Sequence, residues 1–137
     1  MEHLAILKEP FLELILCKEK TIESRWYAHK KAPYERIAEG DVVYLKGTGK
    51  PVAAKAVAGK AMFFDNLNEE KIIKILRQYG KQICIDESYA GKFKGKNYCT
   101  VVFLKDVERI EPFNISKKGY GNMAAWISVD DIRRIKL

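Results

Sequence analysis

The stretch Lys18–Trp26 gathers side chains that could bind an anion or move a proton. Lys20, Glu23 and Arg25 supply an ammonium, a carboxylate and a planar guanidinium within one short segment. Arginine can offer paired donors to a phosphate or a base edge, and a lysine and a glutamate in a closed cleft can transfer protons. If the run from Thr21 is a strand, Glu23 and Arg25 share a face. The alternative is a surface ion-pair cluster, worth at most about 1 kcal/mol.

A basic and aromatic segment, Tyr27–Arg36, follows Trp26 directly. Nucleic-acid surfaces combine cations, which meet phosphates, with aromatic rings, which stack on bases. Tyr27, Lys30 and Lys31 are candidates for these two roles. Trp26 faces away from Glu23 in a regular strand, which favours a place in the core over a stacking role. A solvated surface loop is an equal alternative for the whole segment.

Two further groups of lysines could contact a phosphate backbone. Lys92, Lys94 and Lys96 alternate along the chain, so an extended backbone would place all of them on one side. Lys117 and Lys118 add positive charge to a glycine-containing loop. The alternatives are a solvated edge for the first group and a mobile connection for the second.

The composition is that of one globular domain covering residues 1–137, with 47% hydrophobic and 31% charged residues. The 25 Lys and Arg residues exceed the 18 Asp and Glu residues and give a net charge of +7. This basic balance favours a polyanionic partner such as RNA or DNA. No apolar run reaches the roughly 18 residues of a membrane span, and no secretion signal is visible. We therefore expect a cytoplasmic protein with no membrane partner.

The residues that usually bind metals are few and badly spaced. Cys17, Cys84 and Cys99 lack zinc-site spacing, and the only histidines are His3 and His29. No glycine-rich phosphate loop and no nucleophile elbow is present. We expect no metal and no cofactor. Cys17 and Cys99 lie in apolar runs, which predicts buried, reduced thiols.

The hydrophobic patterns predict strands with uneven spacing and few helices between them. The predicted strands are His3–Leu7, the run from Thr21, Val42–Leu45, Val52–Phe64 with a bend at Gly59, Tyr98–Leu104, Val107–Phe113 and Ala124–Val129. The predicted helices follow Pro10, cover Glu69–Tyr79 with a stop at Gly80, and form short turns near Asp86–Ala90 and Asp130–Arg134. These elements indicate a small α+β protein with a curled, mostly antiparallel sheet or barrel and two or three flanking short helices.

The opening stretch resembles the signature of the ASCH domains, a branch of the PUA-like superfamily, in which Gly-x-Lys-x-x-Glu-x-Arg follows a short helix. Lys20, Glu23 and Arg25 stand at the last three positions, and Lys18 replaces the glycine. The resemblance extends over most of the chain, to the bent segment and to an aromatic strand near Trp126. It implies a small PUA-like β-barrel and a cleft in which the motif meets nucleic acid, with RNA as the expected partner.

Some ASCH members are hydrolases, including amidohydrolases that act on acetylated cytidine. Those enzymes use a lysine that matches Lys20, a threonine where this chain has Glu23, and a glutamate on a following helix near Ile75.

Three hypotheses for the function stay open. The first is an RNA-binding module that recognises a nucleotide or a short single-stranded element.

The second hypothesis is a small hydrolase acting on a modified nucleoside or on RNA, with Lys20 as base and Glu23 aligning water or substrate. The third is a protein-interaction domain, which an exposed apolar patch would reveal. The predicted nucleic-acid-binding residues are Lys20, Glu23, Arg25, Trp26, Tyr27, Lys30, Lys31, Lys92, Lys94, Lys96, Lys117 and Lys118.

Overall fold

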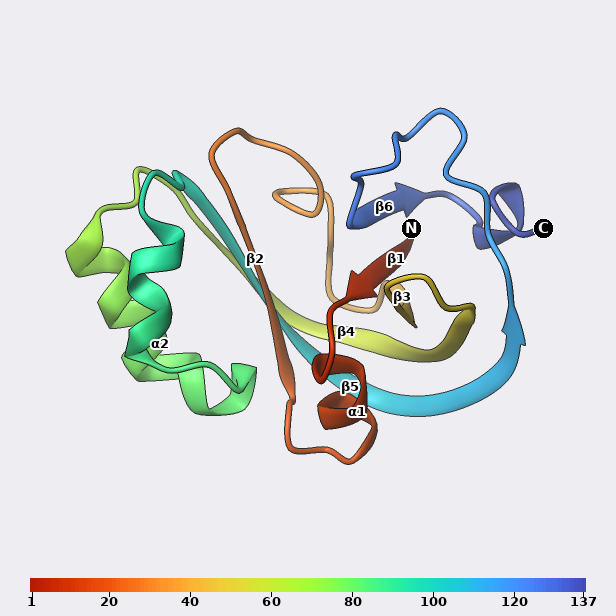
Figure 1. The fold of residues 1–137 in the computed structure, drawn as a ribbon, viewed down its shortest axis with the longest axis horizontal. Coiled ribbons are helices and arrows are strands. Elements are labelled where there is room, and N and C mark those ends of the chain that lie inside the picture. The colour runs from red at the N-terminus through yellow and green to blue at the C-terminus, as the bar shows by residue number, and fades with distance from the viewer.

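The fold, taken from a computed structural model that covers residues 1–137, is a curled six-stranded sheet with short helices around it (Figure 1). The strands are β1 (Glu2–Leu7), β2 (Ile22–Tyr27), β3 (Val42–Gly47), β4 (Val52–Phe64), β5 (Tyr98–Phe113) and β6 (Trp126–Val129). Their order across the sheet is β2-β5-β4-β3-β1-β6. All neighbouring pairs are antiparallel except β1 and β3, which are parallel. The expected small α+β fold is confirmed, as a half-barrel.

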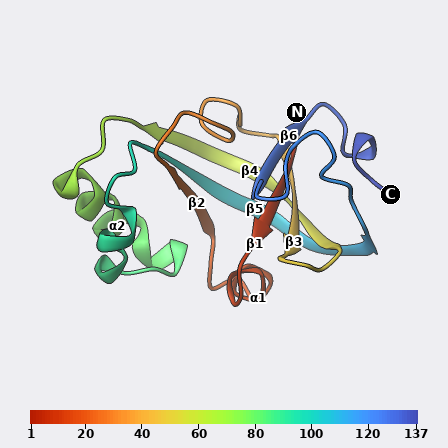
Figure 2. The same cartoon turned by 45° about the horizontal axis from the view of Figure 1, so that its top comes forward.

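The longest helix lies at one end of the curled sheet, a shorter one lies below its middle, and a small turn lies near the C-terminus (Figure 2). The α-helices are α1 (Phe11–Leu16) and α2 (Glu69–Ile83), and the 3-10 helices are η1 (Glu87–Phe93) and η2 (Ile132–Arg134). The buried side of α2, with Ile72 and Ile75, shares an apolar cluster with Ile22 and Trp26 of β2. A second apolar cluster fills the curl of the sheet and is covered by α1. None of the helices combines the length and the apolar character needed to cross a membrane.

Helix α2 starts as predicted and ends later than predicted. The side chain of Asn68 caps its first turn by accepting a hydrogen bond from the Lys71 amide at 2.9 Å. The helix continues past Gly80 to Ile83, where Cys84 adopts a left-handed φ of 68°. The amide of Ile85 then donates to the Gly80 carbonyl at 3.0 Å, which is the pattern of a Schellman end.

Gly80 therefore has a different role from the predicted helix stop. A Cβ atom at this position would lie 2.5 Å from the carbonyl oxygen of Ile85. Only glycine lets the returning chain pack this closely on the last turns of α2. The close approach positions the segment around Ile83 beside β2, where its backbone becomes part of the candidate site.

Two predictions concern the long strands β4 and β5, of which one is confirmed and one is wrong. The bend at Gly59 is confirmed, because the register between the two strands shifts between Ala58 and Ala61. The prediction of two separate strands joined near Lys105 and Asp106 is wrong. Asp106 has a left-handed φ of 53°, but the chain continues as one strand. The register with β4 shifts at this point, between Lys55 and Val57, and the chain does not turn back.

Three smaller predictions concern η1, the residues that follow it, and the cysteines. The turn expected at Asp86–Ala90 is the longer η1, whose Asp86 cap accepts from the Ser88 amide at 2.8 Å. The extended backbone expected for Lys92–Lys96 is wrong, since Lys92 belongs to η1 and Gly95 turns the chain with a φ of 85°. Cys99 is buried as predicted, whereas Cys17 is exposed because it caps the free C-terminal end of α1.

Candidate functional site

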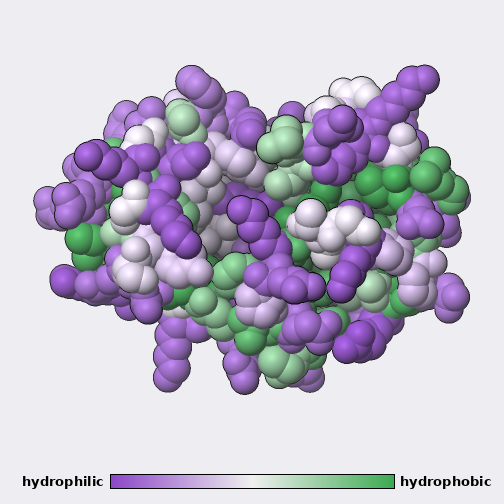
Figure 3. Space-filling model, viewed as in Figure 1, coloured by the Kyte–Doolittle hydropathy of each residue, from purple (hydrophilic) through white to green (hydrophobic).

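An open cleft of about 610 Å³ lies between β2, the end of β1, α1 and η1. Figure 3 shows hydrophilic side chains over most of this face of the molecule, around a hollow near its centre. The charged side chains that line the cleft are Lys8, Glu9, Lys20, Glu23, Arg25, Lys92 and Lys96. The aromatic side chains that line it are Phe11, Trp26, Tyr27, Tyr89 and Phe93. The three residues of the sequence motif thus meet in one concave site.

Lys20 is positioned by a turn that follows α1. Lys18 has a left-handed φ of 68° at the position where the ASCH pattern has glycine, which explains the preference for glycine there. The amide of Lys20 then donates to the Leu14 carbonyl at 2.9 Å. The Lys20 residue is only 2% exposed, and its Nζ donates to the carbonyl oxygen of Ile83 at 2.7 Å. The ammonium is held between α1, α2 and β2.

Glu23 lies between the two cations of the motif. Its Oε1 is 3.2 Å from Lys20 Nζ, and its Oε2 accepts from Arg25 at 3.0 Å. The amide of Ser24 also donates to Oε1, at 2.9 Å. Burial raises the pKa of Glu23, but the charges of Lys20 and Arg25 and these hydrogen bonds outweigh it and bring the pKa below its ordinary value. Glu23 is therefore an ionised acceptor at neutral pH and is not a general acid.

Arg25 joins the two ends of the half-barrel. Strands β2 and β6 are the edges of the sheet and do not pair with each other. The Arg25 guanidinium donates to the Ile6 carbonyl and to the Ala125 carbonyl, both at 3.0 Å, where β1 and β6 meet. It also lies 5.2 Å from the ring centroid of Trp126. Several of the guanidinium N–H groups that could donate to a phosphate therefore already donate to acceptors within the protein.

The buried cluster of Lys20, Glu23 and Arg25 has one net positive charge, and further positive charge lies at the rim of the cleft. Lys8, Lys92 and Lys96 form no ion pair with any carboxylate. Lys92 Nζ lies 4.4 Å from the ring centroid of Tyr89. A basic rim beside aromatic rings suits a ligand that combines phosphate groups with planar bases.

The aromatic wall of the cleft includes one ring that belongs to the core. Trp26 stacks on Phe93 with ring centroids 4.1 Å apart and an interplanar angle of 8°. Its Nε1 donates to Ser24 Oγ at 2.9 Å, and the residue is 9% exposed. One face of the indole is therefore covered by Phe93. Tyr27 and Tyr89 are more exposed than Trp26 and also line the cleft.

The structure separates the remaining predicted site residues into two groups. Lys92 and Lys96 line the cleft, although not through the alternation on which they were predicted. Lys94 does not line it. The predicted residues that lie outside the cleft lining are Lys30, Lys31, Lys94, Lys117 and Lys118. Lys30 pairs with Glu35 at 3.3 Å, and Lys31 Nζ lies 4.3 Å from the ring centroid of Tyr27, so Lys31 borders the same face.

Several lining residues were missed from the sequence. Lys8 follows the first strand immediately, so its place at the strand end was a usable signal. Tyr89 and Phe93 lie in a segment whose short helical turn was predicted without a role. The Ile83 carbonyl that holds Lys20 could not have been found, because a backbone acceptor carries no sequence signature. Nowhere in the chain do three or more His, Cys, Asp or Glu side chains gather as a metal site.

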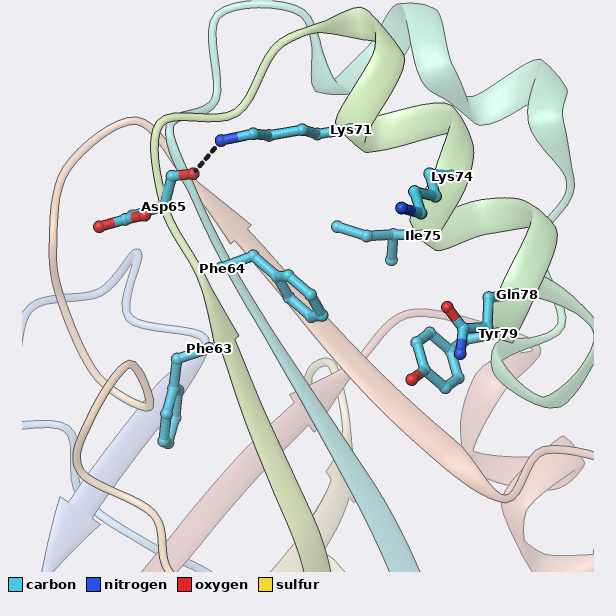
Figure 4. A pocket seen from close by; sticks show the side chains of 8 residues that line it. All are labelled: Phe63, Phe64, Asp65, Lys71, Lys74, Ile75, Gln78 and Tyr79. Carbon is cyan, nitrogen blue, oxygen red and sulfur yellow. Dashed lines mark hydrogen bonds between the residues drawn. The ribbon is translucent and has the colours of Figure 1, made fainter.

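A second pocket, of about 310 Å³, lies between the end of β4 and α2 (Figure 4). Phe64 and Tyr79 form part of its wall, and Lys71 Nζ donates to the Asp65 carbonyl at 3.4 Å. Its charged side chains are all exposed to solvent. The pocket thus lacks the buried, mutually paired charges of the cleft, which is the better candidate for a functional site.

Comparison with solved structures shows the fold of the chain. The ASCH protein of Zymomonas mobilis matches with a TM-score of 0.68 and 20% identity, covering 93% of this chain and 87% of that one. A variant of that protein with one tyrosine changed to phenylalanine matches with a TM-score of 0.72 and 18% identity, covering 97% and 93%. No protein-family model and no curated protein matches the chain. The expected ASCH resemblance is thus confirmed for the fold.

Proposed function

We propose that this chain, which has the ASCH fold, is an RNA-binding module that holds a nucleotide or a short single-stranded element in its cleft. The observation that carries the proposal is the composition of the cleft. A buried, ionised cluster of Lys20, Glu23 and Arg25 lies beside aromatic rings and a rim of unpaired lysines. The net charge of +7 adds long-range attraction for a polyanion.

The roles in this proposal follow from the contacts of each residue. Lys92, Lys96 and Lys8 meet phosphates, because they are the cations of the cleft with no carboxylate partner. Tyr27 and Tyr89 stack on bases. Lys20, Glu23 and Arg25 present donors and acceptors from the floor and keep the cleft in shape, while Trp26 supports the wall. Lys30, Lys31, Lys94, Lys117 and Lys118 provide outer, nonspecific attraction.

The experiment is a titration of a short fluorescein-labelled single-stranded RNA, followed by anisotropy at several salt concentrations. The double variant Lys92→Met, Lys96→Met is expected to bind at least about tenfold more weakly and to lower the salt slope by about 1.4, since two phosphate contacts are lost. Lys60 and Lys74 are exposed, have no ion pair and lie outside the cleft. The matched double variant of Lys60 and Lys74 should retain most of the affinity. Equal losses from both pairs would contradict the proposal.

Stacking is tested separately by Tyr89→Ala. Loss of one base–aromatic contact lowers affinity by about 1–3 kcal/mol with little change in salt slope. Tyr120 is 43% exposed in the loop before β6 and lies outside the cleft, so Tyr120→Ala is the control. If Tyr89→Ala binds as tightly as the unmodified chain, the ring is not a base platform.

A hydrolase acting on a modified nucleoside or on RNA is the second candidate, and the placement of Lys20 favours it. Its Nζ is buried within reach of a carboxylate and a backbone carbonyl, as a positioned acid or base requires. Lys20 Nζ is engaged in the ion pair with Glu23, so base catalysis needs a substrate that displaces this pair. Turnover of acetylated cytidine or labelled RNA that disappears in Lys20→Met would support the enzyme. Intact substrates at high protein concentration would leave binding as the function.

A further inference from the structure

Lys46 occupies an unusual place in the sheet, on the side away from the curl. It pairs across the sheet with Ile6 of β1 and with Val52 of β4, and Val52 pairs in turn with Phe113 of β5. Directly opposite residues share a face, so Lys46 stands in a row of apolar side chains. Ile6 and Val52 belong to a buried apolar cluster. Lys46 is itself only 8% exposed.

The charge of Lys46 has no counter-charge in the protein. Its Nζ donates to the carbonyl oxygen of its neighbour Gly47 at 3.3 Å and to no other group. No Asp or Glu side chain lies within 4.0 Å of this nitrogen. Burial, and after it the charge of Lys117, lower the pKa of Lys46. An ammonium in apolar surroundings is unfavourable unless an anion accompanies it.

The segment that leads from β5 to β6 covers this row and brings a second lysine to it. Ile115 and Ala124, near the two ends of the segment, pack on the apolar cluster that contains Ile6 and Val52. Between them, Lys117 Nζ donates to the Asn122 carbonyl at 2.9 Å and forms no ion pair. The segment that carries Lys117 thus packs on the apolar cluster beside Lys46, and neither lysine has an acidic partner.

We propose that Lys46 and Lys117 bind a phosphate group under the segment Ile115–Ala124. A phosphate supplies the negative charge that Lys46 lacks and accepts hydrogen bonds from both ammonium groups. Lys136, whose Nζ lies 4.8 Å from the ring centroid of Phe113, adds positive charge at the end of the same row. Neither Lys46 nor Lys117 lines the cleft, so this site is separate from the cleft itself.

The test is a titration of the whole chain with inorganic phosphate at constant ionic strength, followed by amide chemical shifts in two-dimensional NMR. The expected result is a saturable shift of the amides of Lys46, Gly47 and the segment Ile115–Ala124, which chloride does not reproduce. A linear response spread over all the exposed lysines, equal for phosphate and chloride, would overturn the proposal.

Variants show whether the two lysines make the site. Lys46→Met keeps an apolar stem of similar length and is expected to weaken phosphate binding at least about tenfold, as loss of a charge-assisted contact predicts. Lys117→Met gives a similar loss and serves if the first variant does not fold. Lys60→Met, at an exposed lysine outside the cleft, is the control and should bind within about twofold of the unmodified chain. Equal affinity in all three variants would also overturn the proposal.

Competition then identifies the source of the phosphate. A short single-stranded oligonucleotide that displaces phosphate from the Lys46 amides indicates a nucleic-acid phosphodiester. An oligonucleotide that shifts only cleft amides, such as that of Ser24, indicates a free phosphate or a phosphomonoester. Either outcome supports the site, and neither depends on whether the cleft binds RNA.

Discussion

The two buried lysines of this chain, Lys20 and Lys46, differ in how their charge is balanced. Lys20 is 2% exposed and has Glu23 Oε1 at 3.2 Å and the Ile83 carbonyl at 2.7 Å. Lys46 is 8% exposed and has only the carbonyl of its neighbour, at 3.3 Å. The charge of Lys20 is balanced by a carboxylate of the chain, whereas the charge of Lys46 is not, and we propose that a bound phosphate balances it. The two sites should therefore respond in opposite directions when a charge is removed.

Removal of Arg25 should have the largest effect on stability. Arg25→Ala leaves Glu23 with one fewer cation and leaves the Ile6 and Ala125 carbonyls without a donor. Breaking a buried charge pair of this kind costs about 3–5 kcal/mol. The measurement is urea unfolding followed by circular dichroism at neutral pH. Arg133→Ala, which removes an exposed pair with Asp131, is the control and should leave the midpoint unchanged.

A substitution that changes no charge should affect the Lys20 site through the backbone. In Gly80→Ala the new methyl group meets the Ile85 carbonyl, so the turn that carries Ile83 must shift. We expect a net loss of about 1–2 kcal/mol, because crowding outweighs the better helix propensity of alanine. Thermal unfolding measures the loss, and Gly91→Ala, where a Cβ meets nothing within 4 Å, is the matched control. An unchanged midpoint would show that the α2 end tolerates displacement.

Lys46→Met should act in the opposite direction to Arg25→Ala. Replacing an uncompensated buried charge by an apolar chain is expected to stabilise the fold by about 1 kcal/mol in phosphate-free buffer at neutral pH. The pKa of Lys46 is below its ordinary value of 10.5, so the unfolded chain binds this proton more tightly. The stability difference should therefore shrink as pH rises through the lowered pKa toward 10.5. Lys60→Met is the exposed control. A loss of stability at neutral pH would contradict the comparison.

The smallest effect is expected at the turn before Lys20. Lys18 has a left-handed φ of 68°, which glycine adopts without steric strain. Lys18→Gly should stabilise the chain by about 0.5 kcal/mol after the entropy of glycine is included. Glu19→Gly, at a residue with no left-handed φ, should lose stability instead. Paired denaturation curves at one pH decide between these signs.

Local pattern predicted much of the fold and of the site. The two-residue period placed Glu23 and Arg25 on one face of β2, and the predicted helix Glu69–Tyr79 begins where α2 begins. The bend at Gly59 was also visible, because a glycine within an apolar run signals a bulge. In each case the signal lies in neighbouring residues, so the sequence could show it.

The features that were predicted wrongly or missed depend on contacts between segments far apart in the sequence. Gly80 was predicted as a helix stop, since its close contact with Ile85 cannot be seen in a linear pattern. Lys46 fell outside the predicted strand Val42–Leu45, whereas β3 continues to Gly47 between β1 and β4. The role of Arg25 at the sheet edges was hidden for the same reason, as its acceptors are backbone carbonyls far along the chain.

The hydrogen bonds of Arg25 to the Ile6 and Ala125 carbonyls also affect how the domain can open locally. The side chain of one residue, and not a ladder of strand hydrogen bonds, connects β2 to the ends of β1 and β6. The two sides of the cleft can therefore part by releasing Arg25 while every pair of strands stays intact. Such a subglobal opening requires much less free energy than global unfolding. In hydrogen exchange, amides of β2 that face this join should exchange earlier than those paired between β4 and β5.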